Sequence, residues 1–198
     1  TVYEECELPL IETMAAMEST GMKVNRDVLE SVGIELDARI TDLENSIYEK
    51  AGQSFNIKSP KQLGVVLFED MGIPYPGRSK KKTGYSTSVD VLEKLRDEHP
   101  IVNDILEYRK ATKLKSTYIE GLIALIADDG KIHPHFNQTV AATGRISCTE
   151  PNLQNIPIRD EYGRNIRKAF VTSNESHTFI GADYSQIELR ILAALSGD

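Results

Sequence analysis

Apolar residues recur at helical spacing in the first half of the chain. Residues 4–20 carry them on one face, and Gly21 follows where such a helix is expected to end. A longer stripe begins after Asn25, which is placed to cap a helix, and extends to Gly52. Its apolar members are Val28, Leu29, Val32, Leu36, Ile40, Leu43 and Ile47. The pattern predicts two amphipathic helices separated by the short extended segment 22–24.

Three further helices are predicted before the turn at Asp129. Ser59, followed by proline at the first helical position, begins one of them, Ser88 begins a short one, and Pro100 opens a long one. Residues 72–87 are dominated by Gly, Pro, Ser, Lys and Thr, so we predict an exposed loop there.

The pattern changes after residue 129. Residues 131–141 alternate as in a strand, residues 143–160 are polar with little periodicity, and residues 178–183 have the pattern of a buried strand. Residues 185–196 then return to helical spacing. We therefore predict an α+β protein, in which a mostly helical part precedes part of an antiparallel sheet.

Asp183 stands where the last predicted strand ends and the last helix begins. Ser185 and Glu188 have the spacing of a capping box, which would fix this turn. The buried face of the helix would consist of Ile187, Ile191, Ala194 and Leu195. A carboxylate on a rigid strand end can bind Mg²⁺, which prefers oxygen ligands. Alternatively, it does no more than favour the positive end of the helix dipole, and spacing alone favours this plainer interpretation.

Charge is unevenly distributed along the chain. The net charge is −7, which taken alone argues against a nucleic-acid partner. However, residues 78–82 include four cations, and a second basic cluster lies on the predicted long helix at Arg109, Lys110, Lys113 and Lys115. Because local patches decide phosphate binding, a nucleic-acid partner stays open.

Other features restrict the class of protein. The apolar runs are far shorter than the roughly 20 residues of a membrane span, so no membrane partner is expected. The first residue is threonine and no signal pattern follows, so we expect the sequence to begin inside a longer chain. Cys6 and Cys148 make neither a disulfide framework nor a metal cluster, which favours a reducing cytoplasm. His133 and His135 share one predicted strand face, and we interpret them as structural.

Residues 183–190, DYSQIELR, resemble the first polymerase motif of the family A DNA polymerases, the family of bacterial DNA polymerase I. Five other segments resemble the polymerase domain of this family, in the same order along the chain: 82–87, 115–118, 143–147, 151–159 and 163–170. The first two are similar to the thumb tip and the long thumb helix, and the others to the palm. The resemblance therefore covers nearly the whole chain.

The resemblance implies a domain organisation and a reaction. Residues 1–129 would form the helical thumb, with a DNA-contacting tip loop at about 72–88. Residues 130–198 would form the N-terminal part of the palm, an incomplete antiparallel sheet that ends after the first catalytic aspartate motif. The implied reaction joins a dNTP to a primer 3′ end on a DNA template, by a mechanism that uses two Mg²⁺ ions.

Several residues would serve the catalytic site by resemblance. Asp183 would bind metal, and Tyr184 would offer its backbone carbonyl to a metal ion. Glu188 would be the steric gate that excludes a ribose 2′-hydroxyl, and Arg159 would support the nucleotide end of the site. The family also needs a second acidic motif and a fingers helix, so the partners include the remaining palm and fingers segment. The chain alone is predicted to be inactive.

Primer–template DNA would contact two regions. Arg145 would reach the minor groove at the primer terminus, and Asn152, Gln154 and Asn155 would line the same surface. The plainer interpretation makes all four ordinary turn residues. The thumb tip would add phosphate contacts from Lys80, Lys81, Lys82, Thr83, Ser86 and Thr87. The plainer interpretation of that tip is a solubilising loop.

Three hypotheses of function follow. The first is an enzyme, the N-terminal part of a family A polymerase domain, in the bacterial cytoplasm and associated with the nucleoid. The second is a stand-alone DNA-binding or structural module, against which Asp183 and Glu188 argue because binding alone needs neither. The third is one half of a split polymerase. A phage-type RNA polymerase shares the fold, but Glu188 at the gate position favours deoxynucleotides.

Overall fold

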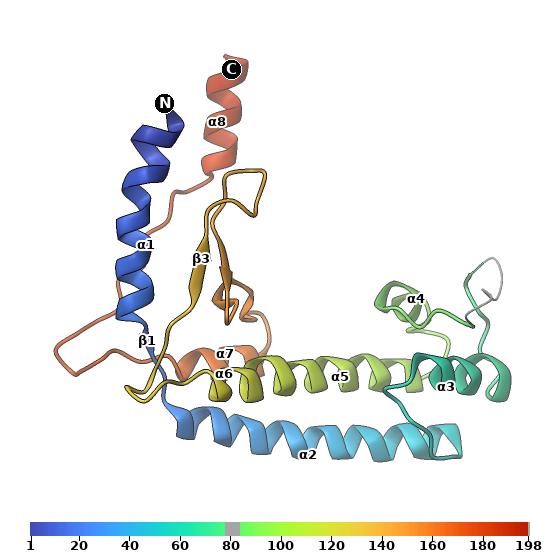
Figure 1. Cartoon of the computed structure of the whole chain (residues 1–198). Helices are drawn as coiled ribbons and strands as arrows, with labels where there is room; N and C mark the ends of the chain where they lie inside the picture. The colour runs from blue at the N-terminus through green and yellow to red at the C-terminus, as the bar shows by residue number, and fades with distance from the viewer. Residues whose placement is uncertain (78–83, 198) are drawn as a thin grey trace.

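The computed structural model describes residues 1–77 and 84–197 of the chain (Figure 1). Helices are named α, strands β, and short π- or 3₁₀-helical segments η. In chain order the elements are η1 (Tyr3–Glu7), α1 (Leu8–Thr20), β1 (Met22–Lys23), α2 (Arg26–Ala51), α3 (Pro60–Val65), η2 (Val66–Asp70), α4 (Val89–Glu93), α5 (Ile101–Lys113), η3 (Leu114–Glu120), α6 (Gly121–Ala124), β2 (Lys131–Ile132), β3 (His135–Asn137), β4 (Ser147–Thr149), η4 (Leu153–Asn155), α7 (Glu161–Lys168) and α8 (Ile187–Ser196). The predicted α+β class is confirmed.

The helix boundaries in the first half follow from capping chemistry. The side chain of Asn25 accepts a hydrogen bond from the backbone N–H of Val28 and so begins α2. Gly52 ends the same helix in a left-handed conformation with φ of 66°, which glycine adopts without steric cost. Ser59 begins α3 by accepting from the N–H of Gln62, as predicted. Ser88 lies at the N-terminal boundary of α4, although its side chain makes no capping hydrogen bond.

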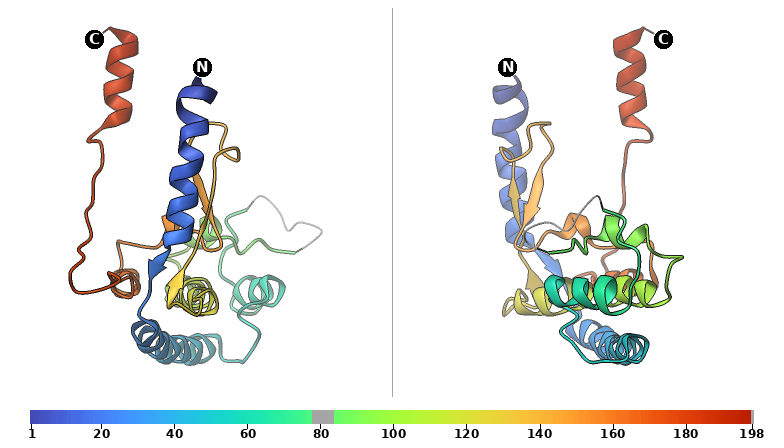
Figure 2. Two further views of the ribbon diagram at one scale, coloured as in Figure 1. Left: turned by 60° about the vertical axis from the view of Figure 1, so that its left-hand side comes forward. Right: turned by 90° about the vertical axis from the view of Figure 1, so that its right-hand side faces the viewer.

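Two long helices form the body of the molecule. α2 and α5 lie side by side and run in opposite directions, with η3 and α6 continuing α5 (Figure 1). α3 and α4 lie at one end of this pair. α1, the β3–β4 hairpin and α8 rise from the other end (Figure 1). Figure 2 shows that α8 stands apart from α1.

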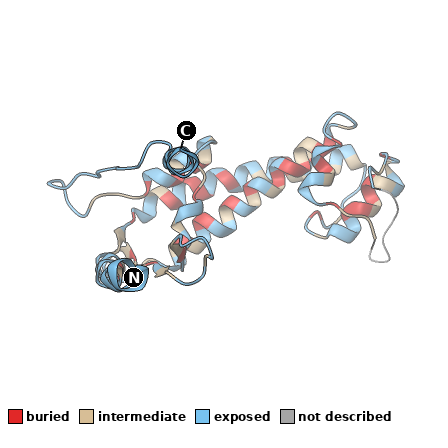
Figure 3. Cartoon of the chain, turned by 90° about the horizontal axis from the view of Figure 1, so that it is seen from above, coloured by how far each residue is buried: buried red, intermediate tan, exposed pale blue. Residues whose placement is uncertain are grey.

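The core lies between the two long helices and has two parts. Buried residues line their facing sides along the whole pair (Figure 3). One part joins α2, η3 and α7 and includes Leu29, Leu36 and Ile166, none of which is exposed to solvent. The other part joins α2, α5 and the α3–η2 region and includes Ile47 and Leu63. The apolar stripe of α2 therefore stabilises the fold through both clusters.

The two small sheets connect distant parts of the chain. β1 pairs antiparallel with β2, with Met22 opposite Ile132. β3 pairs antiparallel with β4, with Phe136 opposite Cys148. An isolated bridge joins Val24 to Phe170. Residues 22–24 thus pair with segments that follow residue 129.

The sheet part is less regular than predicted. The predicted strand 131–141 is interrupted at Pro134, which lacks a donor N–H, so that residues 131–132 form β2, residues 135–137 form β3, and residues 138–141 form no strand. The polar segment 143–160 contains β4 and η4, which its sequence pattern did not indicate. α7 was also not anticipated. Asp160 begins it by accepting a hydrogen bond from the N–H of Gly163 at 2.6 Å.

The predictions for the C-terminal segment were wrong in three respects. Residues 178–183 form no strand, because no segment among the described residues pairs with them, and Ile180 is 89% exposed. The predicted capping box is absent, since α8 begins at Ile187 and its N-cap is Gln186 with φ of 52°. None of the residues of α8 is buried, so its apolar face has no cover within the described chain.

Candidate nucleic-acid interface and catalytic motif

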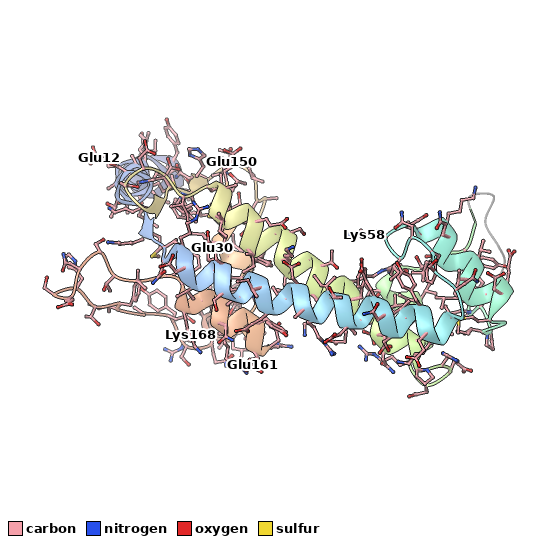
Figure 4. The ribbon with its side chains drawn as sticks, turned by 90° about the horizontal axis from the view of Figure 1, so that it is seen from below. Glu12, Glu30, Lys58, Glu150, Glu161 and Lys168 are labelled. Atoms are coloured by element: carbon pink, nitrogen blue, oxygen red, sulfur yellow. The ribbon has the colours of Figure 1, made fainter. Side chains whose placement is uncertain are left out.

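Cations gather in three adjoining depressions along α5. The first is lined by Arg96, Arg109, Lys110 and Lys113, the second by Lys58, Arg109 and Lys113, and the third by Lys110 and Lys113. We call these five residues the α5 basic strip. Figure 4 shows Lys58 beside α3, at one end of the long helix pair. The fold therefore gathers five cations on one surface of a chain whose net charge is −7, and Glu93, Glu107 and Asp160 lie among them.

The cations near α5 differ in whether they form ion pairs with acidic neighbours. Lys115 lies 2.5 Å from an Asp37 carboxylate oxygen and 3.4 Å from one of Glu120, and the hydrogen bond to Asp37 raises the pKa of Lys115. Lys110 lies 3.8 Å from Asp160. Lys113 has no ion pair within residues 1–77 and 84–197. Lys113 is therefore the cation of this helix that is best placed to meet an external anion.

The third depression lies where the helical part meets the segment after η4. It is lined by Lys110, Lys113, Tyr118, Asn155 and Asp160, among others, and its volume is about 400 Å³. The Tyr118 hydroxyl donates to the Asn155 carbonyl oxygen at 2.6 Å, which ties the two parts together. The basic strip thus continues onto the surface that carries the predicted amides.

The three predicted amide residues are exposed, and their local hydrogen bonds shape the turn around η4. Asn152 caps η4 by accepting from the N–H of Gln154 at 3.0 Å. The Gln154 side-chain amide donates to the Ile146 carbonyl oxygen at 3.1 Å. These bonds support the plainer turn interpretation, although exposure leaves the amides accessible to a partner as well. Arg159 is also exposed.

The structure brings two predicted site residues together. Arg145 lies in the loop between β3 and β4, and Glu188 lies in the first turn of α8. An Arg145 guanidinium nitrogen and a Glu188 carboxylate oxygen are 3.4 Å apart. Both side chains are about three-quarters exposed, so this ion pair contributes little to stability. Its significance is that it joins the hairpin loop to the polymerase-like motif.

Asp183 and Tyr184 lie in the irregular, exposed segment before α8. A carboxylate and a backbone carbonyl suit Mg²⁺ chemically. Among the described residues, however, no group of three or more His, Cys, Asp or Glu side chains is placed to hold a metal ion. The described residues therefore do not form a metal site by themselves.

The predicted tip-loop contacts divide into two groups. Lys80, Lys81, Lys82 and Thr83 lie outside the described residues. The Ser86 hydroxyl donates to Ser88 at 3.3 Å. The exposed-loop prediction was wrong at Ile73 and Thr87, which are 6% and 4% exposed. Ile73 packs into the core, and Thr87 accepts hydrogen bonds from Arg109.

Residues 26–198 match the family described as DNA polymerase family A. The chain belongs to the family A DNA polymerases. No helix in the described part of this polymerase chain is long and apolar enough to cross a membrane.

Similar proteins cover the whole chain, but the chain covers a small part of each. It is 56% identical over 198 residues to DNA polymerase I of Bacillus subtilis (strain 168), of which it spans 22%. It is 48% identical to the thermostable DNA polymerase I of Thermus thermophilus, of which it spans 24%. A solved structure, the POL domain of Pol1 from M. smegmatis in complex with DNA primer-template and dNTP, matches with a TM-score of 0.85 and 47% identity. That match covers 98% of this chain and 34% of the solved one.

The sequence of this family A chain did not single out Lys58 or Arg96 as site residues. Neither belongs to the two basic clusters that the sequence shows at residues 78–82 and 109–115. The tertiary fold brings them beside the three cations of α5, as residues that line the same depressions. A helical wheel of α5 could have placed Arg109, Lys110 and Lys113 near one another, whereas the other two need the tertiary fold.

Proposed function

We propose that the chain forms the thumb and the N-terminal part of the palm of a template-directed DNA polymerase, and that it binds primer–template DNA along the α5 basic strip. The continuity of this strip with the surface around Asn155 carries the proposal. Cations and amide groups on one surface suit duplex DNA, because the cations meet phosphates while the amides reach the minor groove. The bacterial relatives support a place near the nucleoid in the cytoplasm.

The proposed thumb is the helical part up to residue 129, and the proposed palm part follows from residue 130. The pairing of β1 with β2 and of Val24 with Phe170 supports one refinement. Residues 1–24 pack with the segments after residue 130, so we assign them to the palm side of the junction. The thumb would then comprise residues 25–129.

The catalytic proposal concerns the C-terminal motif. Asp183 would supply one carboxylate, and Tyr184 one backbone carbonyl, to Mg²⁺ ions whose other ligands come from the remaining palm and fingers segment. Glu188 would exclude the 2′-hydroxyl of a ribonucleotide by filling the space it needs. In primer extension by the complete polymerase, Glu188→Ala should admit ribonucleotides. Unchanged sugar selectivity would contradict the gate assignment.

DNA binding by the chain itself tests the first part of the proposal. We would measure fluorescence anisotropy of a labelled primer–template over a series of salt concentrations, for the wild type and for Lys113→Gln. If Lys113 meets a phosphate, its removal lowers affinity and reduces the slope of log K against log salt by about 0.9. Lys115→Gln is the matched control. Lys115 continues the same helix but already forms ion pairs with acidic neighbours, so its removal should affect DNA binding less. Equal losses in both variants, or none in either, would contradict the assignment of the strip.

A further inference from the structure

The last residues of the tip loop are held firmly before α4 begins. The ring of Tyr85 lies 5.0 Å from that of Phe68 and 5.2 Å from that of Tyr75, measured between centroids. Gly64 in α3 comes so close that a Cβ placed there would lie 3.0 Å from the Tyr85 Cβ. The N–H of Ser86 donates to the Tyr75 hydroxyl at 3.4 Å. Aromatic packing therefore fixes residues 85 and 86 against the helical part.

Thr87 is fixed from a different direction, by α5. One guanidinium nitrogen of Arg109 donates to the carbonyl oxygen of Thr87. The other donates to its hydroxyl oxygen at 3.0 Å. Thr87 is 4% exposed, so both acceptors are largely shielded from solvent. A planar guanidinium can hold a backbone and a side-chain acceptor of one residue at the same time, whereas a lysine ammonium lacks this fork geometry.

This arrangement separates Arg109 from the other cations of the α5 basic strip. Lys113 carries an exposed charge with no ion pair in the described part of the chain. Arg109 instead directs two donors at a neutral residue of the loop, and it is half-buried, which lowers the pKa of its guanidinium. Two donors of Arg109 are therefore already directed at the loop, whereas the Lys113 charge has no ion-pair partner among the described residues.

We propose that Arg109 is a positioning residue of the DNA interface: it clamps Thr87 and thereby fixes residues 85–87, at the described end of the tip loop, relative to the other cations of the α5 basic strip. The inference rests on the proposed DNA-binding function. It assigns Arg109 an indirect role, because its effect on DNA passes through the loop. Loss of the clamp should release the loop end from α5 and weaken DNA binding even when no charge is removed.

Thr87→Val tests the clamp most sharply, because valine keeps the shape and the net charge but cannot accept a hydrogen bond at that position. We would measure binding of the labelled primer–template to the 198-residue chain for Thr87→Val, Arg109→Gln and the double variant. We expect Thr87→Val to weaken binding by about five- to tenfold, the loss that one hydrogen bond supplies. The double variant should bind no more weakly than Arg109→Gln alone, because both changes break one clamp.

Two further variants keep the test decisive. Thr87→Ser retains the hydroxyl and should bind within about twofold of the wild type, which separates the clamp from a general packing defect. Lys113→Gln should reduce the salt slope, whereas Thr87→Val should lower affinity at every salt concentration. Wild-type affinity in Thr87→Val, together with a reduced salt slope in Arg109→Gln, would overturn the inference and make Arg109 a direct phosphate contact. Absence of DNA binding by the wild type would instead overturn the proposed function, and the interface role of Arg109 with it.

Discussion

The long helix pair and the C-terminal segment illustrate opposite outcomes of the same kind of sequence pattern. Apolar residues recur at helical spacing in both α2 and α8. In α2 they are buried, and Leu36 has no exposed surface. In α8 they face solvent, and Leu192 is 61% exposed. Periodicity thus identifies the face that favours burial, but only the tertiary structure shows whether a partner covers it.

The two regions also carry different parts of the proposed chemistry. The α5 basic strip lies on helices whose buried faces fix them to one another. Asp183 and Glu188 lie on a segment that has no buried residue from Asn174 to Gly197. DNA binding should therefore be a property of the described fold itself, whereas catalysis should depend on what covers the C-terminal segment.

The largest expected difference between the regions concerns stability. Leu36→Ala should lower the free energy of unfolding by about 2–5 kcal/mol, because it leaves a cavity between α2 and η3. Leu192→Ala should change it by less than about 0.5 kcal/mol, since the side chain already faces solvent. Urea unfolding followed by circular dichroism measures both. A comparable loss in the two variants would show that α8 is packed in solution.

A smaller effect is expected at the helix N-termini. Asn25→Ala should cost about 1 kcal/mol, because the side chain caps α2. Ser185→Ala should be close to neutral, since α8 begins two residues later without a side-chain cap. The same unfolding experiment compares them. If Ser185→Ala lowered the free energy of unfolding as much as Asn25→Ala does, the result would support the capping box that the sequence predicts.

The smallest effect is a pH dependence at the junction between α1 and the sheet part. His133 Nδ1 lies 2.7 Å from the Glu18 carbonyl oxygen, and Nε2 lies 3.1 Å from an Asp129 carboxylate oxygen. These hydrogen bonds raise the pKa of His133 above 6.5, while burial and Lys131 oppose them. The resulting stabilisation is fully present below the unfolded-state pKa and is lost as pH rises through the folded-state pKa.

Unfolding free energies of the wild type and His133→Gln, measured over a pH series, check this sign. The advantage of the wild type should shrink as pH rises through the folded-state pKa. A difference that stays constant, or grows toward alkaline pH, would contradict the assignment.

Local chemistry explains which elements the sequence could predict. Asn25, Ser59 and Gly52 begin or end a helix through contacts within one or two turns of it, so their roles could be predicted from the sequence alone. α7 also has a local signal, with Asp160 at its N-cap and Arg167 and Lys168 in its last turn, but it was not recognised among the polar residues around it. The strand predicted at 178–183 depended on a distant partner, which local pattern cannot supply.

The site divides in the same way. The motif around Asp183 and Glu188 could be recognised from the sequence because its residues resemble those of the family. The match to the family model confirms that resemblance. The contact between Arg145 and Glu188 could not be predicted from the sequence, because 43 positions separate the two residues. The burial of Thr87 could not be predicted from the sequence either. Its hydrogen-bond partner Arg109 is 22 positions away on another element.

Primer extension tests the central claim most directly. We would supply Mg²⁺, dNTPs and primer–template to the chain alone, and then to the chain mixed with a polypeptide that carries the remaining palm and fingers segment of a family A polymerase. The account predicts extension only in the mixture, and its loss in Asp183→Ala. Extension that survives Asp183→Ala would contradict the catalytic assignment. Salt-sensitive DNA binding with no extension in either sample would instead favour a stand-alone DNA-binding module.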